Sequence, residues 1–170
     1  MANQDSQEHD FSKPAGDDFN ALSRDLVPVR SMVEADLEQI IRIDRHITKR
    51  DRSAYLRRRA AQALQESGVC ISLAAERHER VVGFIMAKVD YGEFGHTDTV
   101  AVIDTIGVDP SEQMHHVGHA LVSQLLRNLA SLRVETVRTE VPWQNFGLNQ
   151  FLAHCGFAPA QRLAFSLDID

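Results

Sequence analysis

The sequence has little of what several special classes of protein require. Only two of its 170 residues are cysteine, Cys70 and Cys155, and their wide separation fits no disulfide framework. They indicate reduced thiols in a cytosolic protein. No apolar run approaches the roughly 20 residues that cross a bilayer, and the polar, acidic start MANQDSQEHDFSKPAGDD lacks the apolar core of a signal peptide. We therefore expect a soluble, cytoplasmic protein with no membrane partner.

An excess of positive charge is also missing. The net charge is −6, so the overall balance gives no support for a nucleic-acid partner. What the chain does have is 44% hydrophobic residues, enough for one well-formed core. Residues 1–25 are polar with scattered apolar positions, and we expect a disordered tail there. The rest, 26–170, has the size of one domain.

The hydrophobic periods along this domain predict six strands and four helices. Strands are expected at 26–33, 69–76, 81–91, 99–108, 136–141 and 161–169, and helices at 34–47, 53–67, 117–132 and 146–156. The near-continuous apolar run at 99–108 is typical of a strand that is covered on both faces. The order β-α-α-β-β-β-α-β-α-β predicts an α/β domain built on one mixed sheet.

The stretch VDPSEQMHHVGHAL, residues 108–121, leads from that strand into the third helix. The first N–H groups of a helix have no intrahelical partner and lie at the positive end of its dipole, so they suit a phosphate. Gly118 would let the backbone approach such an anion closely. A metal site is an alternative, because His115 and His119 share a helix face, but zinc needs three or four ligands. A third alternative is a helix start with solvated histidines.

The surrounding segments resemble the GCN5-related N-acetyltransferases (GNAT). In that family a strand with an apolar-x-Val-x-Pro stretch is followed by the turn Gln/Arg-x-x-Gly-x-Gly/Ala and a helix, as in VIDTIGVDPSEQMHHVGHALVSQLL. EADLEQIIRI resembles the family's first helix, RVVGFIMAKV its third strand and NFGLNQFLAHCGF its closing segment. The resemblance covers about residues 27–167. It implies a single acetyltransferase-like domain.

The resemblance also implies a function, the transfer of an acetyl group from acetyl-CoA, as co-substrate, to a primary amine of a small molecule or a protein. No metal takes part. The residues implied to hold the cofactor are Ile106, Gly107, Val108, Gln113, Met114, His115, His116, Val117, Gly118, His119 and Asn145. For Gly107 the alternative is tight packing under the following helix, and for Asn145 it is a helix N-cap. Family members are often dimers, which implies a homodimer by analogy.

Two carboxylates are candidates for the base that removes the amine proton. Asp104 lies in the middle of the strand at 99–108, and burial among apolar neighbours would raise its pKa. The alternative is a structural Asp bonded to backbone or to an arginine. Glu140 lies in the next expected strand, where the alternative is a solvated residue. Tyr55 and Trp143 are candidate acceptor contacts, although packing explains an aromatic residue at a strand end equally well.

The motif is incomplete at two positions. His116 replaces the first glycine of the turn, so the turn is strained or reshaped if that position needs a positive φ. Leu152 stands at the position of the family's usual tyrosine, which acts as a general acid, and leucine cannot donate a proton. His154 and Cys155 are the candidate replacements. Both departures favour an alternative function, a catalytically degenerate acyl-CoA-binding or interaction module with the same fold.

A basic stretch follows the first expected helix. Eight of the eighteen Lys and Arg residues lie between positions 42 and 59. In the resembling family this region borders the acceptor site, so the stretch would attract an acidic acceptor or the 3′-phosphate of the cofactor. The alternative is a solvated helix face with salt bridges to Asp44 and Asp51.

Overall fold

The structure of the protein is a computed structural model that describes residues 26–65, 70–91, 99–161 and 166–169. The chain divides into two compact units, one that ends at Arg138 and one that begins at Thr139, and each is described by itself. The expected tail at 1–25 and the last two positions of the expected helix at 53–67 lie outside the described residues. None of the helices in the described residues combines the length and the apolar composition of a bilayer-spanning segment.

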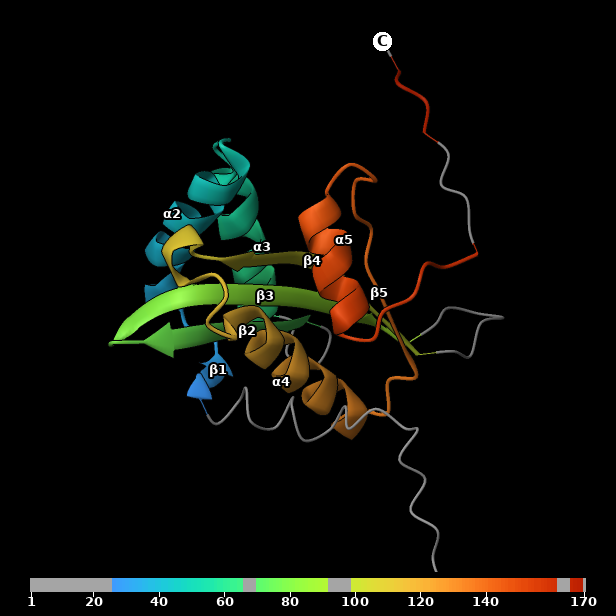
Figure 1. Cartoon of the computed structure of the whole chain (residues 1–170), viewed down its shortest axis with the longest axis horizontal. Coiled ribbons are helices and arrows are strands. Elements are labelled where there is room, and N and C mark those ends of the chain that lie inside the picture. Colours follow the sequence, from blue (N-terminus) through green and yellow to red (C-terminus); the bar gives the residue numbers. More distant parts are fainter. Residues whose placement is uncertain (1–25, 66–69, 92–98, 162–165, 170) are drawn as a thin grey trace, which may run out of the picture. The chain divides into compact units, whose positions relative to one another are not determined.

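The first unit is built on a five-stranded sheet with the order β1-β2-β3-β4-β5 (Figure 1). The strands are β1 Val29–Ser31, β2 Cys70–Arg77, β3 Arg80–Asp90, β4 Val100–Val108 and β5 Thr136–Arg138. Neighbouring strands are antiparallel except β4 and β5, which are parallel, so the sheet is mixed as predicted. The stretch RHER, residues 77–80, forms a hairpin between β2 and β3, in which His78 and Glu79 take the positive φ that a tight two-residue turn requires.

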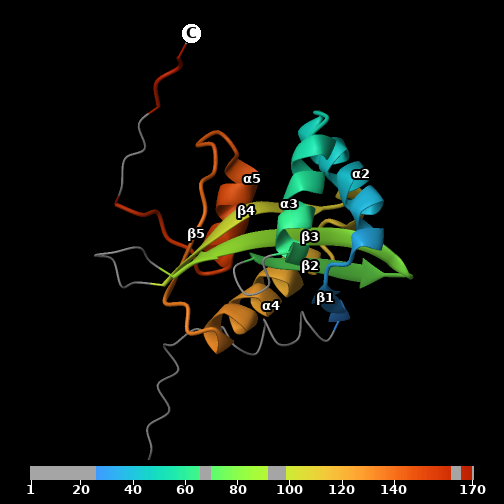
Figure 2. The same ribbon diagram turned by 180° about the vertical axis from the view of Figure 1, so that it is seen from behind.

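Helices cover both faces of this sheet. Helices α2 (Leu37–Thr48) and α3 (Ser53–Gln65) pack on the face that carries Phe84 and Met86 of β3. Helix α4 (Val117–Ser131) lies on the opposite face, as the two views of Figures 1 and 2 show. The second unit contains α5 (Phe146–His154). Short 3₁₀ turns, η1 (Glu34–Asp36) and η2 (Pro110–Glu112), precede α2 and α4.

The core follows from the apolar stripes of the helices. On α4, Leu121, Leu125 and Leu129 are at most 1% exposed, as their spacing predicts. On the other face Ile40 of α2 and Leu56 of α3 are completely buried. Burying one such side chain stabilises the fold by about 1.5–3 kcal/mol, so these two layers hold the sheet between them.

The predicted elements differ from the structure at the C-terminal end. Residues 166–169 form no strand, and Leu167 and Ile169 are 88% and 92% exposed. Positions 162–165 of the expected strand lie outside the described residues. Strand β5 ends at Arg138, short of the predicted 141, and the chain then runs to Pro142, which has no N–H for a strand ladder. Short β-prone stretches need a partner strand, which the sequence pattern does not provide.

Candidate active site

Within the described residues, strand β4 has a neighbouring strand on both sides at its start and on one side only further along. On one side it pairs with β3, where the register skips from Ile103 to Thr105 and leaves Asp104 without a counterpart. Asp104 is thus the extra residue of a β-bulge, which bends a strand and increases its twist. On the other side β4 pairs with β5 only over Val100–Val102, and no strand in the described part of the chain continues this edge. The bulge lies just beyond the point where β4 and β5 part.

The carboxylate of Asp104 forms an ion pair with Arg59 of α3. The side chains are 24% and 17% exposed, respectively. The expectation that Asp104 is buried among apolar neighbours is wrong, because the residue as a whole is exposed and its side chain has a cationic partner. The bulge explains the difference, since it interrupts the alternation of faces on which the expectation rested. An aspartate bonded to an arginine, the other interpretation of the sequence, describes this contact.

A second ion pair lies beside the first. Asp44 of α2 is 3% exposed and accepts hydrogen bonds from Arg52, with 3.0 Å between Arg52 Nε and Asp44 Oδ2. The same guanidinium donates to the hydroxyl of Thr105, the residue after the bulge, over 3.3 Å. The ring of Tyr55 lies 5.6 Å from the guanidinium carbon of Arg52 and packs against the core. These contacts fix Tyr55 structurally, and its role in binding the acceptor stays a prediction.

The turn before α4 has two non-glycine residues in the left-handed region. Met114 has φ 66°, and His116 has φ 62° and ψ 7°. His116 directly precedes the helix, caps it with no side-chain hydrogen bond, and stands where the motif has a glycine. The conformation that glycine adopts without strain is therefore held here by a histidine, at a cost on the order of 1 kcal/mol.

The residues of this turn are exposed to solvent. The four residues 113–116 are exposed, while Val117 is buried and anchors the helix to the sheet. The first turn of α4 contains no acidic residue. An anion would therefore meet the positive end of the helix dipole with no opposing carboxylate on that turn.

The histidines do not assemble a metal site. His115 Nδ1 is 3.9 Å from a carboxylate oxygen of Glu112, and that carboxylate is paired with Arg77 of β2. The rings of His116 and His119 are 6.4 Å apart between centroids. No group of three His, Cys, Asp or Glu side chains that could hold a metal ion occurs among the described residues.

Close packing on the α2 face of the sheet leaves no room for a side chain at Gly107. A Cβ atom there would lie 2.6 Å from Cε1 of Phe84 and 3.1 Å from Cδ1 of Ile47. Tight packing was expected under the following helix, but Gly107 packs against α2, and it is Gly83 that lies under α4. The neighbours Ile106 and Val108 are half-buried on the same strand edge.

The second unit holds the remaining predicted residues. Asn145 accepts a hydrogen bond from the Leu148 N–H over 3.2 Å and so acts as the N-cap of α5, which was one of its two interpretations. Trp143 is 83% exposed. Glu140 is exposed and lies after the end of β5, so the prediction that it lies on a strand is wrong. The roles of these three residues in binding or catalysis stay predictions.

Leu152, which stands where the family motif has a tyrosine, is buried. Leu152 is 7% exposed and contributes an apolar side chain to α5. Of its two candidate replacements, His154 contacts the Gln150 carbonyl through Nδ1 over 2.7 Å. Burial raises the pKa of the Cys155 thiol to about 11. Cys155 therefore stays protonated near neutrality, as a half-buried thiol does.

The family model for the acetyltransferase (GNAT) family matches residues 35–157, which is most of the chain. The chain belongs to this family. The GNAT model spans the bulged strand, the turn at 113–119 and α5. Among curated proteins, no sequence matches the chain.

Solved structures with the same fold are distant in sequence. An aminoglycoside acetyltransferase AAC(6')-Iy, in complex with a CoA bisubstrate analog, is 18% identical with a TM-score of 0.72, over 85% of this chain and 99% of that one. An aminoglycoside acetyltransferase from an uncultured soil metagenomic sample is 16% identical with a TM-score of 0.69, covering 86% and 98%. Glucosamine-6-phosphate N-acetyltransferase from Arabidopsis thaliana is 14% identical with a TM-score of 0.68, covering 85% and 99%. At these identities the likeness shows the GNAT fold.

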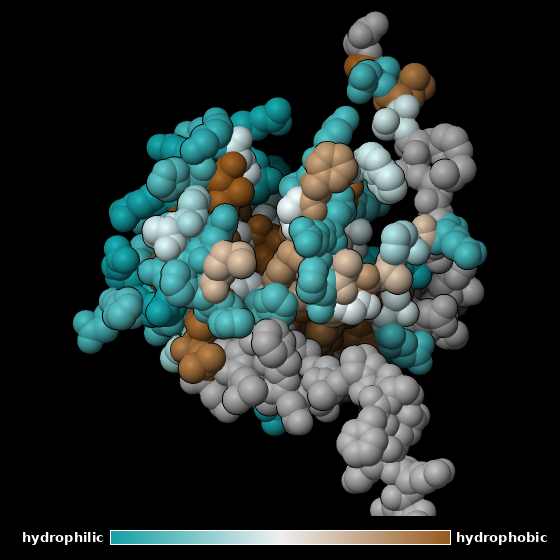
Figure 3. Space-filling view, in the orientation of Figure 1, coloured by the Kyte–Doolittle hydropathy of each residue, from teal (hydrophilic) through white to brown (hydrophobic). Residues whose placement is uncertain are grey.

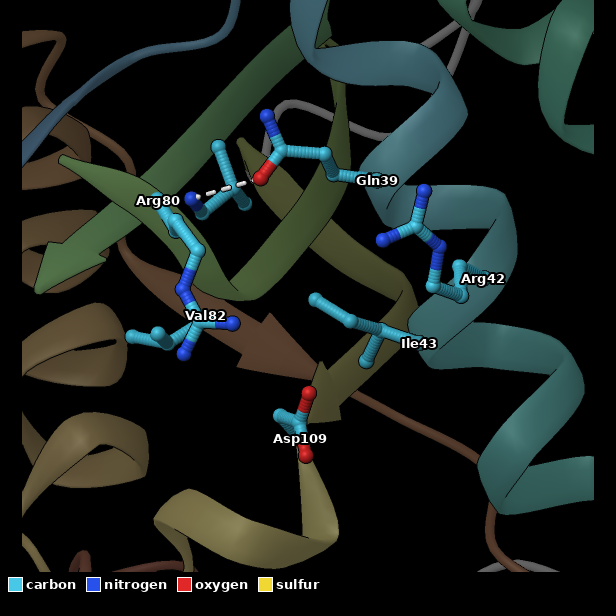
Figure 4. Close-up of a pocket in the computed structure, with 7 residues that line it drawn as sticks. Gln39, Arg42, Ile43, Arg80, Val82 and Asp109 are labelled. Atoms are coloured by element: carbon cyan, nitrogen blue, oxygen red, sulfur yellow. Dashed lines mark hydrogen bonds between the residues drawn. The ribbon is translucent and has the colours of Figure 1, made fainter. Parts of the chain in front are cut away.

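An open pocket lies near the far end of β4 of this GNAT chain (Figure 4). It is shallow and open to solvent, and it lies between Gln39, Arg42 and Ile43 of α2 and Arg80, Val81, Val82 and Asp109. Hydrogen bonds from Ser111, with the nearby charges of His46 and Arg80, hold the pKa of Asp109 below its usual range. The pocket lies five residues beyond Asp104, roughly 16 Å along the strand, so it is separate from the bulge.

Two features of this region escaped the sequence analysis. The partner of Asp104 is Arg59, which lies 45 positions earlier, and a pairing across two elements leaves no local pattern. Arg59 was noted only as one of eight cations. Arg80 and Asp109 lie within segments that the sequence analysis quoted, but neither was singled out as a functional residue.

Proposed function

We propose that the protein transfers the acetyl group of acetyl-CoA to a primary amine by direct attack, with no covalent enzyme intermediate. The observation that carries this proposal is the open edge of β4, which runs from the bulge at Asp104 to the turn before α4. Family membership supports the reaction class. The geometry supports the place where the reaction occurs.

The residues along this edge fit the two polar parts of the cofactor. Ile106, Gly107 and Val108 offer backbone groups on the side of β4 that no described strand covers, which suits an amide-containing arm. At the end of this edge, the N–H groups of the first turn of α4 suit the pyrophosphate. The first turn of α4 carries no acidic residue that would repel this group. No metal is needed for this arrangement.

Acetyl-CoA, when bound, supplies an acetyl group that its thioester activates. The protein must then hold the amine, remove its proton and keep it in line with the acetyl carbon. In this proposal the amine binds next to Asp104, whose side chain keeps 24% of its surface exposed beside Arg59. The Arg59 guanidinium keeps the Asp104 carboxylate ionised, so Asp104 can hold and orient the ammonium, although this pairing makes it a weaker base. The amine proton leaves through water, with Asp104 as the first candidate to receive it. Glu140 is the second candidate for this role.

Leu152 has no proton to give, and its side chain is buried. In this proposal water protonates the departing thiolate. Because a thiol is a good leaving group near neutral pH, a dedicated acid is less necessary for a thioester than for an amide.

Calorimetric titration of the metal-free protein with acetyl-CoA tests the proposal, together with the variant Gly118→Trp. We expect micromolar binding by the wild type and at least a hundredfold loss in the variant, because an indole in the first turn blocks the approach to the backbone. An amine screen that follows release of the CoA thiol then tests turnover, with Asp104→Asn and Glu140→Gln as the paired variants.

The outcomes separate the two candidate functions. No binding of the wild type at millimolar acetyl-CoA rejects both the transferase and the binding module. Binding without thiol release across amino acids, amino sugars and polyamines supports the degenerate acyl-CoA-binding module, which His116 and Leu152 favour. If Asp104→Asn leaves turnover unchanged, Asp104 is not the base, and Glu140 or water alone removes the amine proton.

A further inference from the structure

The α2–α3 region is strongly cationic on an acidic protein. Residues 42–59 contain eight Lys and Arg residues and only two acidic ones, Asp44 and Asp51, while the whole chain has a net charge of −6. Arg45 pairs with Asp51 and Arg52 with Asp44, as the sequence alternative anticipated. Such a concentration of one sign on one surface attracts ligands of the opposite sign.

Ion pairs account for only half of these cations. Besides the two pairs above, Arg57 pairs with Glu38 and Arg59 with Asp104. The other four are exposed and have no carboxylate partner within the described residues: Arg42, Lys49, Arg50 and Arg58. Hydrophilic side chains cover this side of α2 and α3 in Figure 3. The uncompensated charge on this surface is therefore positive.

The Arg59–Asp104 pair at the bulge lies where this cationic layer meets the open edge of β4, next to the Arg52–Thr105 contact. Asp104 and Arg59 keep 24% and 17% of their side-chain surface in contact with solvent. A ligand at this point meets a carboxylate and a guanidinium side by side. Arg59 presents a planar set of donors that matches a carboxylate or a phosphate group, and Asp104 matches an ammonium.

We propose that the acceptor is a small amine that also carries a negatively charged carboxylate or phosphate group. Its ammonium lies against Asp104 and its anionic group against Arg59. This inference rests on the proposed function and names the substrate class of that site. It separates the protein from the aminoglycoside acetyltransferases that share its fold, because an aminoglycoside has several ammonium groups and no anion to set against the cations of α2 and α3.

Matched acceptors test the charge rule directly. We would compare L-alanine with L-alaninamide, and glucosamine 6-phosphate with glucosamine, and include spermidine and kanamycin as polycations. For each, kcat/KM comes from CoA thiol release, and binding to the CoA complex comes from calorimetry. We expect the anionic member of at least one pair to be preferred tenfold or more, and the preference to shrink as salt rises. A preference for alanine points to the carboxylate, and one for the sugar phosphate points to the phosphate.

Variants locate the preference. Arg59→Gln should abolish it through KM, and Arg59→Lys should keep part of it. Arg58→Gln removes the same charge one position along the helix from an exposed residue without a described carboxylate partner, so it should reduce the preference far less than Arg59→Gln. Thermal unfolding of Arg59→Gln shows whether this variant is folded. If it is unfolded, the double variant Arg59→Gln with Asp104→Asn is used instead, because it also removes the carboxylate that the single substitution leaves unpaired.

Three results would overturn the inference while leaving the proposed function in place. They are a higher kcat/KM for spermidine or kanamycin, a charge preference that survives Arg59→Gln, and neither binding nor turnover of any anionic amine by a protein that binds acetyl-CoA. Failure to bind acetyl-CoA is a separate outcome that removes the proposed function itself.

Discussion

The guanidinium of Arg52 donates hydrogen bonds to both carboxylate oxygens of Asp44, a residue of α2 that is only 3% exposed. Through the Thr105 hydroxyl the same guanidinium reaches β4 beside the bulge. One side chain thus ties α2 and the start of α3 to the strand of the candidate site. Hydrogen bonding to Asp44 is the main cause that raises the pKa of Arg52, which stays charged under all ordinary conditions.

Arg52→Met should destabilise the fold more than Asp44→Asn. Removing the cation leaves a buried carboxylate uncompensated, which costs about 3–5 kcal/mol. Removing the carboxylate leaves a guanidinium that is 35% exposed and can be hydrated, so we expect a cost of about 1–2 kcal/mol. Urea unfolding followed by circular dichroism measures both. Equal costs, or a milder Arg52→Met, would contradict this account of the pair.

His116→Gly should stabilise the protein. His116 has φ 62°, which a histidine adopts with strain and glycine without it, so we expect a gain of about 0.5–1 kcal/mol in the free energy of unfolding. The matched control is His115→Gly. This neighbour is not among the described residues with positive φ, so the substitution should cost stability through the entropy of the unfolded chain. A gain from both variants, or from neither, argues against strain at His116. Thermal unfolding of the three proteins decides.

Gly107→Ala tests the close packing on the α2 face. Its Cβ would lie 2.6 Å from the ring of Phe84, so either the ring or β4 must move, at a cost of about 1–3 kcal/mol. Gly147 in α5 is the control, because a Cβ there meets nothing within 4 Å and alanine favours a helix by about 1 kcal/mol. Chemical denaturation should therefore move the two midpoints in opposite directions. If Gly107→Ala leaves the free energy of unfolding unchanged, the ring of Phe84 can move aside at little cost.

The sequence predicted the fold because the apolar stripes of α2 and α4 and the hairpin at 78–79 are local patterns with one structural solution. The turn before α4 was located correctly for the same reason. Asp104 was misjudged because a bulge depends on the pairing of two strands, and strand alternation shows no trace of it. The Arg59 partner was missed because nothing in a stretch of eight cations distinguishes the one that reaches across to β4.

At the C-terminal segment, residues 161–169, the sequence pattern predicted a strand that the described part of the segment does not form. Residues 161–169 have the alternation of a strand, but Leu167 and Ile169 are exposed and the described part of the segment is not paired. Alternation tells which face a strand would bury, not whether a partner strand is present. The position of Glu140 beyond the end of β5 has a similar cause, since the pairing with β4 stops three residues after it begins.

Acid should weaken the protein through Asp36. Its side chain is 5% exposed and accepts two hydrogen bonds from Arg30 of β1, at 2.7 and 2.8 Å, which are the main cause of a pKa below the ordinary value of 3.8. A group with a lowered folded-state pKa adds stability that is complete above the unfolded value and is lost as the pH falls through the folded one. We therefore expect the free energy of unfolding to fall below about pH 4, by about 1.4 kcal/mol for each unit that separates the two pKa values. Asp36→Asn should be less stable at pH 7 and should lose less between pH 4 and pH 2. An unchanged acid slope in Asp36→Asn would assign the acid sensitivity to other carboxylates.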